Sequence, residues 1–373
     1  EPPAPNNACD DVNANNVLIA NVNANYTCYN ITSSSIIFDC NGFTIRGNTS
    51  GYGINVSNKN HITIKNCIIA NFSRGISFEN SINITLLNIT ILNATNFGIY
   101  IKNSANNSVT NITISNSRPP HVAGQGTNMT GIYLENVSNG SFADITIQRL
   151  TAGNTTAAGQ PGGDVYGVAY INSQFVNFTN VYIERLIAGQ GIKTQTGAAF
   201  GHSGNVSGIY TSNFNTTIFR NISIYNLLGT TGSIGKGNIG NGGAGSESSN
   251  VFGIYSLNSV NGTFSNLTLS NFSSGNAGAG GATSSATGGT GGNAGSIFGF
   301  YLQNSYNFSV DSVTILNFTG GNGGGGGLDG SDTATGGVGG IGGAVYSIGL
   351  FVQSINASIS NLNIRFLKGG NGG

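Results

Sequence analysis

The sequence has little charge, little proline and no long hydrophobic run. Only 7 % of its 373 residues are charged, Lys plus Arg and Asp plus Glu number 13 each, and there are six Pro, one Met and no Trp. Without a basic surface that could neutralise phosphates, nucleic acid and anionic lipid are not expected partners. No apolar run approaches the roughly 18 residues that a membrane span needs, so membrane insertion is not expected either.

Glycine and asparagine are abundant instead, with 60 and 55 residues, a composition unlike that of an ordinary enzyme. A chain with so few charges and no net charge tends to associate unless glycans or other groups keep it in solution. The sequence contains 24 Asn-x-Ser/Thr sites, whereas chance placement gives roughly 11. The chain begins at Glu1 without an initiator Met, as it would after removal of a signal peptide. We therefore expect an extracellular, cell-surface glycoprotein.

All four cysteines lie in the first 67 residues, an even number that predicts two disulfides. Three pairings are open from sequence. We expect residues 1–35 to form a disulfide-stapled cap, followed by a second domain over residues 36–373. A metal site is disfavoured, because no pair has C-x-x-C spacing. The four residues are Cys9, Cys28, Cys40 and Cys67.

An internal repeat dominates the rest of the chain. Each copy opens on a glycine and keeps the next 18 positions in register without a gap, and a ninth copy is expected from Gly349 with one residue deleted. Asparagine stands five residues after the glycine in every one of the first eight copies. The opening glycines are Gly53, Gly75, Gly98, Gly131, Gly167, Gly208, Gly253 and Gly299.

Within each copy apolar residues alternate with polar ones, the period of β-strands. A minimum unit of 22 or 23 residues offers three short strands separated by Gly or Asn corners. Such a unit is too short for a βαβ crossover. It predicts an all-β parallel β-helix with three sheets and about 9–10 coils, each coil pairing with its copy about 4.8 Å away.

These residues resemble the right-handed parallel β-helix repeat superfamily, which includes pectate lyases, NosD-type periplasmic proteins and archaeal and bacterial surface proteins. The resemblance rests on an opening coil, Phe38-Asp39-Cys40-Asn41-Gly42-Phe43-Thr44-Ile45, and on the Gly-Ile-Tyr-x-x-Asn-Ser units after it, and it covers about residues 36–367. It implies the fold strongly and the function hardly at all.

The spacing between opening glycines grows along the chain, and all of the growth falls at one corner after the third strand. These Gly-rich inserts are either flexible linkers or extended chains packed side by side in a polyproline-II-like layer, because several glycines recur with a period of three. We expect the inserts at about residues 117–130, 150–166, 186–207, 227–252, 272–298 and 318–348.

The best catalytic candidates are Glu79 and Glu135, which fall at the same repeat position two coils apart with Lys102 between them. Two coils correspond to roughly 9.6 Å, at the edge of the carboxyl separation of an inverting glycosidase. A cross-strand Glu-Lys-Glu charge ladder explains the same residues without chemistry and is favoured. No histidine shares a repeat position with a matching nucleophile, so no triad is predicted.

An outward-facing column of aromatic residues is expected on one sheet. The column is either a stabilising ladder, a surface covered by the inserts or a second subunit, or a binding site for sugar faces, and covering or subunit contact is favoured. Its members are Tyr100, Tyr133, Tyr210, Tyr255 and Tyr301.

The Asn-x-Ser/Thr sites also repeat in register. At one repeat position, thirteen residues after the opening glycine, the asparagines are expected to form an inward ladder. Two other repeat positions fall at outward corners that could carry glycans. The candidate glycosylation residues are Asn71, Asn83, Asn93, Asn106, Asn139, Asn261, Asn271, Asn307 and Asn317.

Together these features favour an extracellular structural protein, N-glycosylated and self-assembling into a surface layer, sheath or filament. On this interpretation the chain is not an enzyme, has no cofactor or metal, and has further copies of itself as its main partner. The alternative is a secreted polysaccharide-active lyase or hydrolase, or a glycan-binding adhesin, on the same scaffold.

Overall fold

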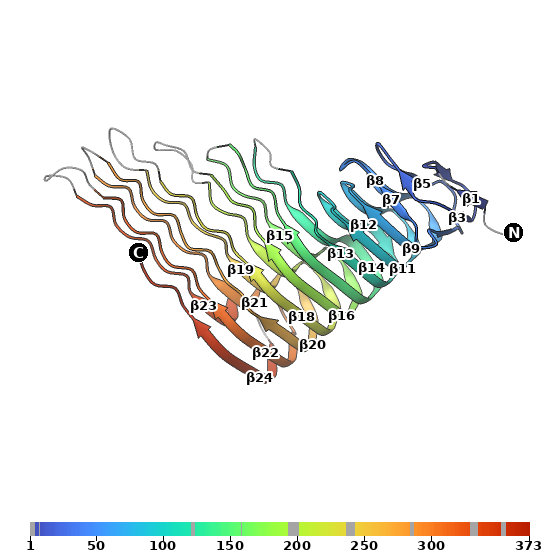
Figure 1. The fold of residues 1–373 in the computed structure, drawn as a ribbon. Helices are drawn as coiled ribbons and strands as arrows, with labels where there is room; N and C mark the ends of the chain where they lie inside the picture. Colours follow the sequence, from blue (N-terminus) through green and yellow to red (C-terminus); the bar gives the residue numbers. More distant parts are fainter. Residues whose placement is uncertain are drawn as a thin grey trace.

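The computed structural model describes residues 4–6, 8–120, 124–157, 159–192, 201–235, 243–283, 287–328, 335–351 and 356–373. The described chain is all β and forms one elongated solenoid whose coils follow one another from the N-terminal to the C-terminal end (Figure 1). Over these residues there is no helix of the length and apolarity that crossing a membrane would take.

One strand of every coil belongs to the first sheet, and every pairing in it is parallel. The first part of β14 (Met129–Thr151) belongs to it as well. Its other strands are β2 (Asp11–Val12), β5 (Tyr29–Ile31), β8 (Tyr52–Ser57), β10 (Arg74–Glu79), β12 (Phe97–Ala105), β15 (Val165–Ile171), β17 (Val206–Ser212), β19 (Val251–Leu257), β21 (Ile297–Gln303) and β23 (Val345–Phe351).

The second and third sheets share long strands that bend at a corner without losing their pairing to the next coil. These strands are β9 (Asn60–Ala70), β11 (Ile82–Leu92), β13 (Ser108–Ser115), the rest of β14, β16 (Gln174–Ile187), β18 (Asn215–Leu228), β20 (Val260–Ser270), β22 (Ser309–Thr319) and β24 (Ser358–Lys368). Near the N-terminus the second sheet continues through β1 (Ala4–Asn6), β3 (Asn16–Leu18) and β6 (Ile37–Asp39), and the third through β4 (Val22–Asn23) and β7 (Thr44–Arg46).

The predicted parallel β-helix is thereby confirmed, and the reason is the period-two pattern. Alternate residues of each strand point into a continuous core, where like side chains stack from coil to coil. Phe142, Phe178, Phe219 and Phe264 are fully buried, and their successive ring centroids lie 5.0, 4.9 and 4.8 Å apart. The core therefore runs along the solenoid axis from coil to coil.

Corners are made by single residues with positive φ, and most of them are asparagine. Asn tolerates this left-handed conformation better than other residues with a Cβ. At Asn88 and Asn111, φ is 56° and 55°, and the amide nitrogen of Asn111 donates to the amide oxygen of Asn88 at 3.3 Å. These side chains are exposed, so the ladder expected 13 positions after the glycine exists but points outward, and the expected inward direction was wrong. The reason is that the backbone at this corner needs φ > 0, and each asparagine amide then bonds to the equivalent asparagine of the next coil along the outer surface.

Opening glycines are required by close packing. A Cβ built on Gly131 would lie 2.6 Å from the carbonyl oxygen of Gly167 in the next coil and 2.9 Å from the side chain of Ile147. The same contact recurs at the equivalent glycines. The opening glycines thus mark the positions where consecutive coils approach too closely for any side chain.

The two disulfides pair Cys9 with Cys28 and Cys40 with Cys67, which resolves the three pairings left open by the sequence. Each bond joins successive coils near the N-terminus. Cys9 and Cys28 precede the paired strands β2 and β5, whereas Cys40 follows β6 and Cys67 lies in its partner strand β9. The coil stack therefore continues below residue 36. A separate cap over residues 1–35 stays a prediction.

The last coil lies in a different register from the one expected. Phe300 pairs with Ile348 and Tyr301 with Gly349, so Ser347 takes the place of the opening glycine. The ninth copy therefore begins two residues before Gly349, and the predicted start was wrong. The coil carries an insertion between β23 and β24, whereas a deletion was expected.

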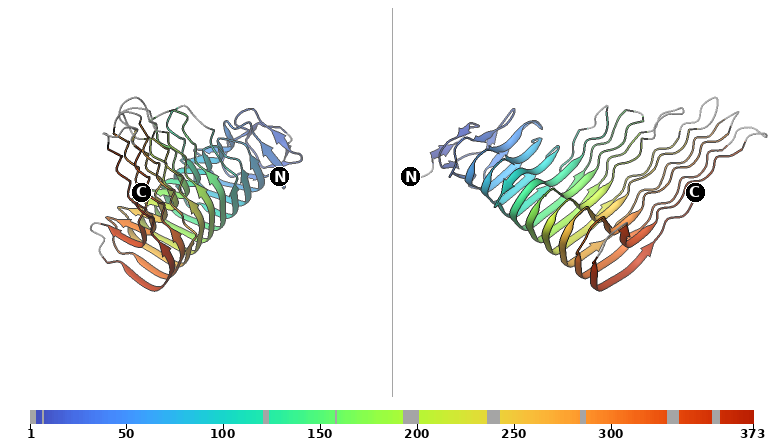
Figure 2. Two further views of the ribbon diagram at one scale, coloured as in Figure 1. Left: turned by 60° about the vertical axis from the view of Figure 1, so that its left-hand side comes forward. Right: turned by 180° about the vertical axis from the view of Figure 1, so that it is seen from behind.

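The Gly-rich inserts project from one side of the solenoid as parallel extended chains and lengthen towards the C-terminal end (Figures 1 and 2). Their backbones hydrogen-bond in two directions. Within one insert the Gly292 amide donates to the Gly278 carbonyl at 2.9 Å, and between inserts the Gly280 amide donates to the Gly325 carbonyl at 2.8 Å. The described parts of these inserts form an ordered layer, as the side-by-side alternative predicted. We call this layer the glycine flange.

Replacing Gly278 by alanine should disrupt the glycine flange. Its Cβ would lie 1.9 Å from the Ser233 carbonyl oxygen, so neighbouring chains must separate, at a cost of about 1–3 kcal/mol. Gly325→Ala is the matched control, since a Cβ there meets nothing within 4 Å. We expect faster amide hydrogen exchange in residues 243–250 and 275–283 for Gly278→Ala alone. Equal exchange in the two variants would contradict the layered packing.

Removing the Cys40–Cys67 bond with a Cys40→Ala/Cys67→Ala double substitution should destabilise the N-terminal coils. The bond closes a loop with a sequence separation of 27 residues, for which loss of chain constraint costs about 3 kcal/mol. Hydrogen exchange should accelerate in β6, β7 and β9 and stay unchanged in β20 to β22. Unchanged protection at the N-terminal end would show that the disulfide adds nothing to the stack.

Candidate functional site

The outer face of the first sheet carries two adjacent columns of aromatic side chains. Tyr100 and Tyr133 stack with centroids 5.1 Å apart, and Tyr255 contacts Tyr210 at 5.3 Å and Tyr301 at 4.9 Å. These tyrosines therefore lie in one column, with ring contacts on either side of Ala169, and its role as an interface or stabilising ladder stays a prediction. A second column runs beside it and contains Phe97, Tyr166, Phe252, Phe298 and Tyr346, with Thr130 and Ser207 between the aromatic residues. We call these two columns the aromatic face.

The tyrosine column is interrupted once, at Ala169. This residue pairs with Tyr133 on one side and Tyr210 on the other, so the two tyrosines stand two coils apart, about 9.6 Å. Where the missing ring would lie there is a cavity of about 290 Å³. We call this cavity the Ala169 slot. It is lined by Phe97, Asn128, Thr130, Tyr133, Tyr166, Ala169, Ile171 and Tyr210.

Carboxylates stand at the edge of the Ala169 slot and hold its tyrosines in place. The Tyr133 hydroxyl donates to Glu135 at 3.1 Å, and the Tyr166 hydroxyl donates to Asp164 at 3.0 Å. Burial, reinforced by these carboxylates, raises the pKa of both tyrosines well above the usual value. Both hydroxyls therefore stay protonated at neutral pH and can keep donating.

Glu79 and Glu135, the catalytic candidates, are engaged in ion pairs. Lys102 Nζ lies 3.1 Å from Glu135 Oε1, and this hydrogen bond raises the pKa of Lys102. Glu79 instead binds Arg74 at 3.2 Å. Lys102 is paired with both glutamates in strand register, so the charge ladder predicted from the sequence is present, with one of its two expected ion pairs redirected to Arg74.

Arg74 closes one end of the aromatic face. Its guanidinium carbon lies 3.8 Å from the centroid of the Tyr100 ring and 5.4 Å from that of Phe97. Because such cation–π contacts order both partners, Arg74 and Glu79 fix the rings that lead to the Ala169 slot. Arg74 thus contacts aromatic rings and Glu79, and Lys102 is paired with Glu135.

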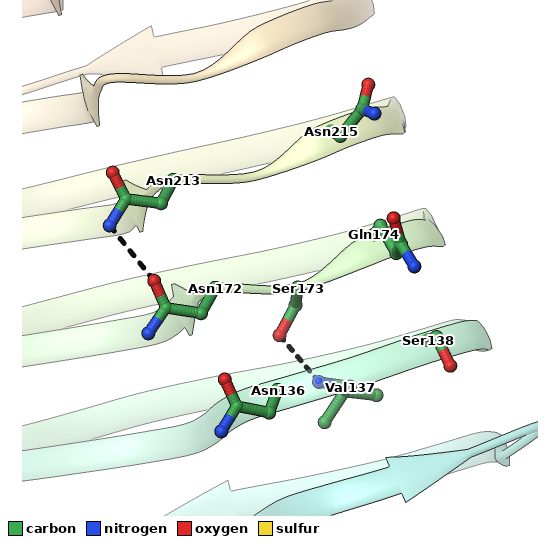
Figure 3. A pocket seen from close by; sticks show the side chains of 8 residues that line it. All are labelled: Asn136, Val137, Ser138, Asn172, Ser173, Gln174, Asn213 and Asn215. Atoms are coloured by element: carbon green, nitrogen blue, oxygen red, sulfur yellow. Dashed lines mark hydrogen bonds between the residues drawn. The ribbon is translucent and has the colours of Figure 1, made fainter.

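A second depression lies at the corner where the first sheet ends (Figure 3). Its volume is about 400 Å³, and its lining is uncharged and, apart from Val137, polar. Asn213 donates to Asn172 at 2.9 Å and Asn136 to Asn103 at 2.9 Å. Across this part of the described structure no hydrogen bond joins Asn136 to Asn172. We call this depression the amide pocket; it is lined by Asn136, Val137, Ser138, Asn172, Ser173, Gln174, Asn213 and Asn215.

A larger cavity of about 610 Å³ lies in the glycine flange. Three of its eight lining residues are glycine, and the others include His202, Glu247 and Asn293 but no Phe or Tyr. Among the residues that the structure describes, no three His, Cys, Asp or Glu side chains gather as metal ligands would. Of the two cavities, the Ala169 slot is the one lined by Phe and Tyr rings.

The candidate glycosylation residues stand at the corners, and several belong to asparagine ladders. Asn93 donates to Asn71 at 3.0 Å, Asn307 to Asn261 at 3.2 Å and Asn317 to Asn271 at 3.0 Å. The need for positive φ and for ladder bonds accounts for the asparagines in register without a glycan. N-glycosylation at these nine residues stays a prediction.

Sequence reasoning missed Ala169, Tyr166, Asp164 and the amide pocket. One signal was available, because Ala169 is the sole exception among the tyrosines from Tyr100 to Tyr301 in their column. Tyr166 and Asp164 precede the opening glycine, next to inserts of varying length, and so fall outside the aligned positions.

The model of a right-handed β-helix region matches residues 6–200. No curated protein sequence matches the chain. Among solved structures it is similar to the catalytic domain of a GH87 α-1,3-glucanase in complex with nigerose, with 12 % identity and a TM-score of 0.34, covering 96 % of this chain and 63 % of that one. The chain thus spans less than two thirds of that domain.

Two other similar structures are covered over most of their length. The A-module of the mannuronan C-5 epimerase AlgE6 from Azotobacter vinelandii has 10 % identity and a TM-score of 0.42, with 95 % of this chain and 91 % of that one covered. The surface protein and adhesin PfbA of Streptococcus pneumoniae has 12 % identity and a TM-score of 0.31, with 92 % and 90 % covered. These similarities concern the fold alone.

The expectation that the chain is not an enzyme is corrected by these structures. The catalytic domain of a glucanase and the A-module of an epimerase are among the solved β-helices similar to it. Because the family model matches more than half of the sequence, the chain belongs to the right-handed β-helix family.

Proposed function

We propose that this protein is an extracellular glycan-binding β-helix whose binding site is the Ala169 slot. The observation that carries the proposal is the single gap in the tyrosine column, flanked by Tyr133 and Tyr210 and hollow to about 290 Å³. That volume is near the lower end for small-molecule sites and fits one sugar ring rather than an extended ligand.

The slot has the chemistry that sugars require. Sugar rings present apolar C–H faces to aromatic rings and hydroxyl groups to polar side chains, and Tyr combines both kinds of surface. Tyr133 and Tyr210 stand on opposite sides of the gap, so a sugar between them contacts a ring on each face. Asn128 and Thr130 line the same cavity and offer hydrogen-bonding groups at its edge.

Charges around the slot favour an uncharged glycan. The nearest ionised groups, Glu135 and Asp164, are carboxylates that accept hydrogen bonds from slot tyrosines. Lys102, the closest cation in strand register, is paired with Glu135. A uronic acid would meet negative charge with no free cation to balance it, whereas neutral hexoses carry no such penalty.

The disulfides support an extracellular location, because such bonds persist in oxidising compartments. Self-assembly into a surface layer, sheath or filament stays a prediction, and glycan binding does not depend on it.

Filling the slot should abolish binding. Ala169→Tyr restores the residue found at this position in the neighbouring coils and places a ring where the sugar would lie. On an array of neutral and uronic-acid oligosaccharides, with cleavage monitored in parallel, the unaltered protein should bind neutral glycans, and Ala169→Tyr should lose at least about tenfold in affinity. Ala143→Tyr, on the outer face of the second sheet, is the matched control and should bind normally.

Two results would overturn this proposal. Failure of the unaltered protein to bind any oligosaccharide would remove the function, and undiminished binding by Ala169→Tyr would remove the slot as its site. A preference for uronic acids would contradict the charge argument.

A further inference from the structure

The coil that begins at Gly167 departs from its neighbours at several outward positions on the same side of the solenoid. Ala169 replaces a tyrosine. Six residues later Phe175 occupies a corner where the preceding coil has Asn139. Between them, no hydrogen bond joins Asn172 to Asn136, a break in the described ladder that recurs between Asn58 and Asn80 and between Asn213 and Asn258. Two departures, Ala169 in the tyrosine column and Phe175 at a corner, thus fall on one coil within seven residues.

Phe175 is unusual in both conformation and exposure. Its φ is 54°, a left-handed conformation that Asn adopts readily and a bulky aromatic residue rarely adopts. Its side chain is 48 % exposed, and the ring contributes nothing to the buried core. A structural corner at this position is better served by Asn, as Asn139 shows with a φ of 52°. Phe366 in the last coil shows the same combination, with a φ of 58° and 75 % exposure. Phe175 differs in directly following Gln174, which lines the amide pocket.

The Ala169 slot and the amide pocket meet on this coil. Ile171 lines the slot, and the next residue, Asn172, lines the amide pocket (Figure 3). Gln174 lines the far part of the same pocket, and Phe175 follows it directly. From Ala169 to Phe175 the chain spans at most about 20 Å. One surface path therefore leads from the slot, over the amide groups, to the exposed ring.

The geometry points to an extended binding site that crosses the coil, rather than one that follows the solenoid axis. This inference rests on the proposed function. A neutral polysaccharide places one sugar in the Ala169 slot, the following sugars over the amide pocket, and a further sugar face on the ring of Phe175.

The amide pocket fits this ligand class. Its eight lining residues are uncharged, and they include Asn, Gln and Ser side chains that both donate and accept hydrogen bonds. The missing bond between Asn136 and Asn172 leaves an amide oxygen and an amide N–H facing the pocket for sugar hydroxyls. Aromatic surface at both ends with amides between them matches a chain of neutral sugars, since each sugar offers an apolar face and hydroxyl edges.

Phe175→Asn tests the inference without threatening the fold, because it restores the corner residue of other coils. Binding is measured by calorimetry with two- to six-unit neutral oligosaccharides derived from cellulose, mannan and xylan. We expect Phe175→Asn to weaken binding of six-unit oligosaccharides about tenfold, leave disaccharide binding unchanged, and not lower the thermal unfolding midpoint. Phe175→Leu, which keeps apolar bulk but loses the aromatic face, should give the same loss.

His61→Asn is the matched control. His61 occupies the same repeat position on a distant coil, also with positive φ, at 58°, and its replacement should leave all affinities unchanged. Equal affinities of Phe175→Asn and the unaltered protein for six-unit ligands would overturn the inference and leave the slot intact. Equal weakening of disaccharides and longer ligands would overturn it too. Failure of every neutral oligosaccharide to bind would overturn the proposed function and this extension together.

Discussion

The parallel pairing of each coil with the next, about 4.8 Å away, is the constraint on which the rest of the structure depends. It places every residue directly above its counterpart, so that any repeat position becomes a column along the solenoid. Inward columns form the core, as in the stack from Phe142 to Phe264. Corner columns must adopt positive φ, which selects asparagine, and the close approach of coils at Gly131 and its counterparts excludes any side chain.

The same constraint explains the unusual composition. A charged side chain repeated in a column meets its own copy one coil away, so like charges repel, whereas amide side chains bond to one another and aromatic rings stack. The alternation of Glu79, Lys102 and Glu135 is one way in which this chain carries charge in a column. Glycine in the inserts lets bare backbones approach and hydrogen-bond in two directions, which gives an ordered flange from a sequence typical of a flexible linker.

Most of the fold was predictable from the sequence because stacking makes it periodic. The opening glycines, the corner asparagines and the alternating apolar residues predicted the strands and the parallel β-helix correctly. Features that break the repeat were harder to predict. The register of the last coil depends on an insertion between β23 and β24, and the Cys40–Cys67 pairing depends on which residues face each other across adjacent coils. The outward direction of the Asn88 ladder follows from corner geometry that spacing alone does not contain.

The candidate site was predicted only in part, for a related reason. Glu79, Glu135 and the tyrosine column stood out because they repeat. The slot arises where the repeat fails, at Ala169, and its walls include Tyr166 from outside the aligned positions. In a solenoid built from copies, an exception that leaves a hollow surface is more informative about binding than the residues that conform. Bound ligand is therefore expected at one coil of the aromatic face rather than along its length.

A crystal structure of the full chain soaked with a neutral six-unit oligosaccharide tests this account most directly. The account predicts sugar density between the rings of Tyr133 and Tyr210, continuing across the coil towards Phe175. Density confined to the glycine flange, density running along the solenoid axis, or an empty slot at saturating ligand would contradict it.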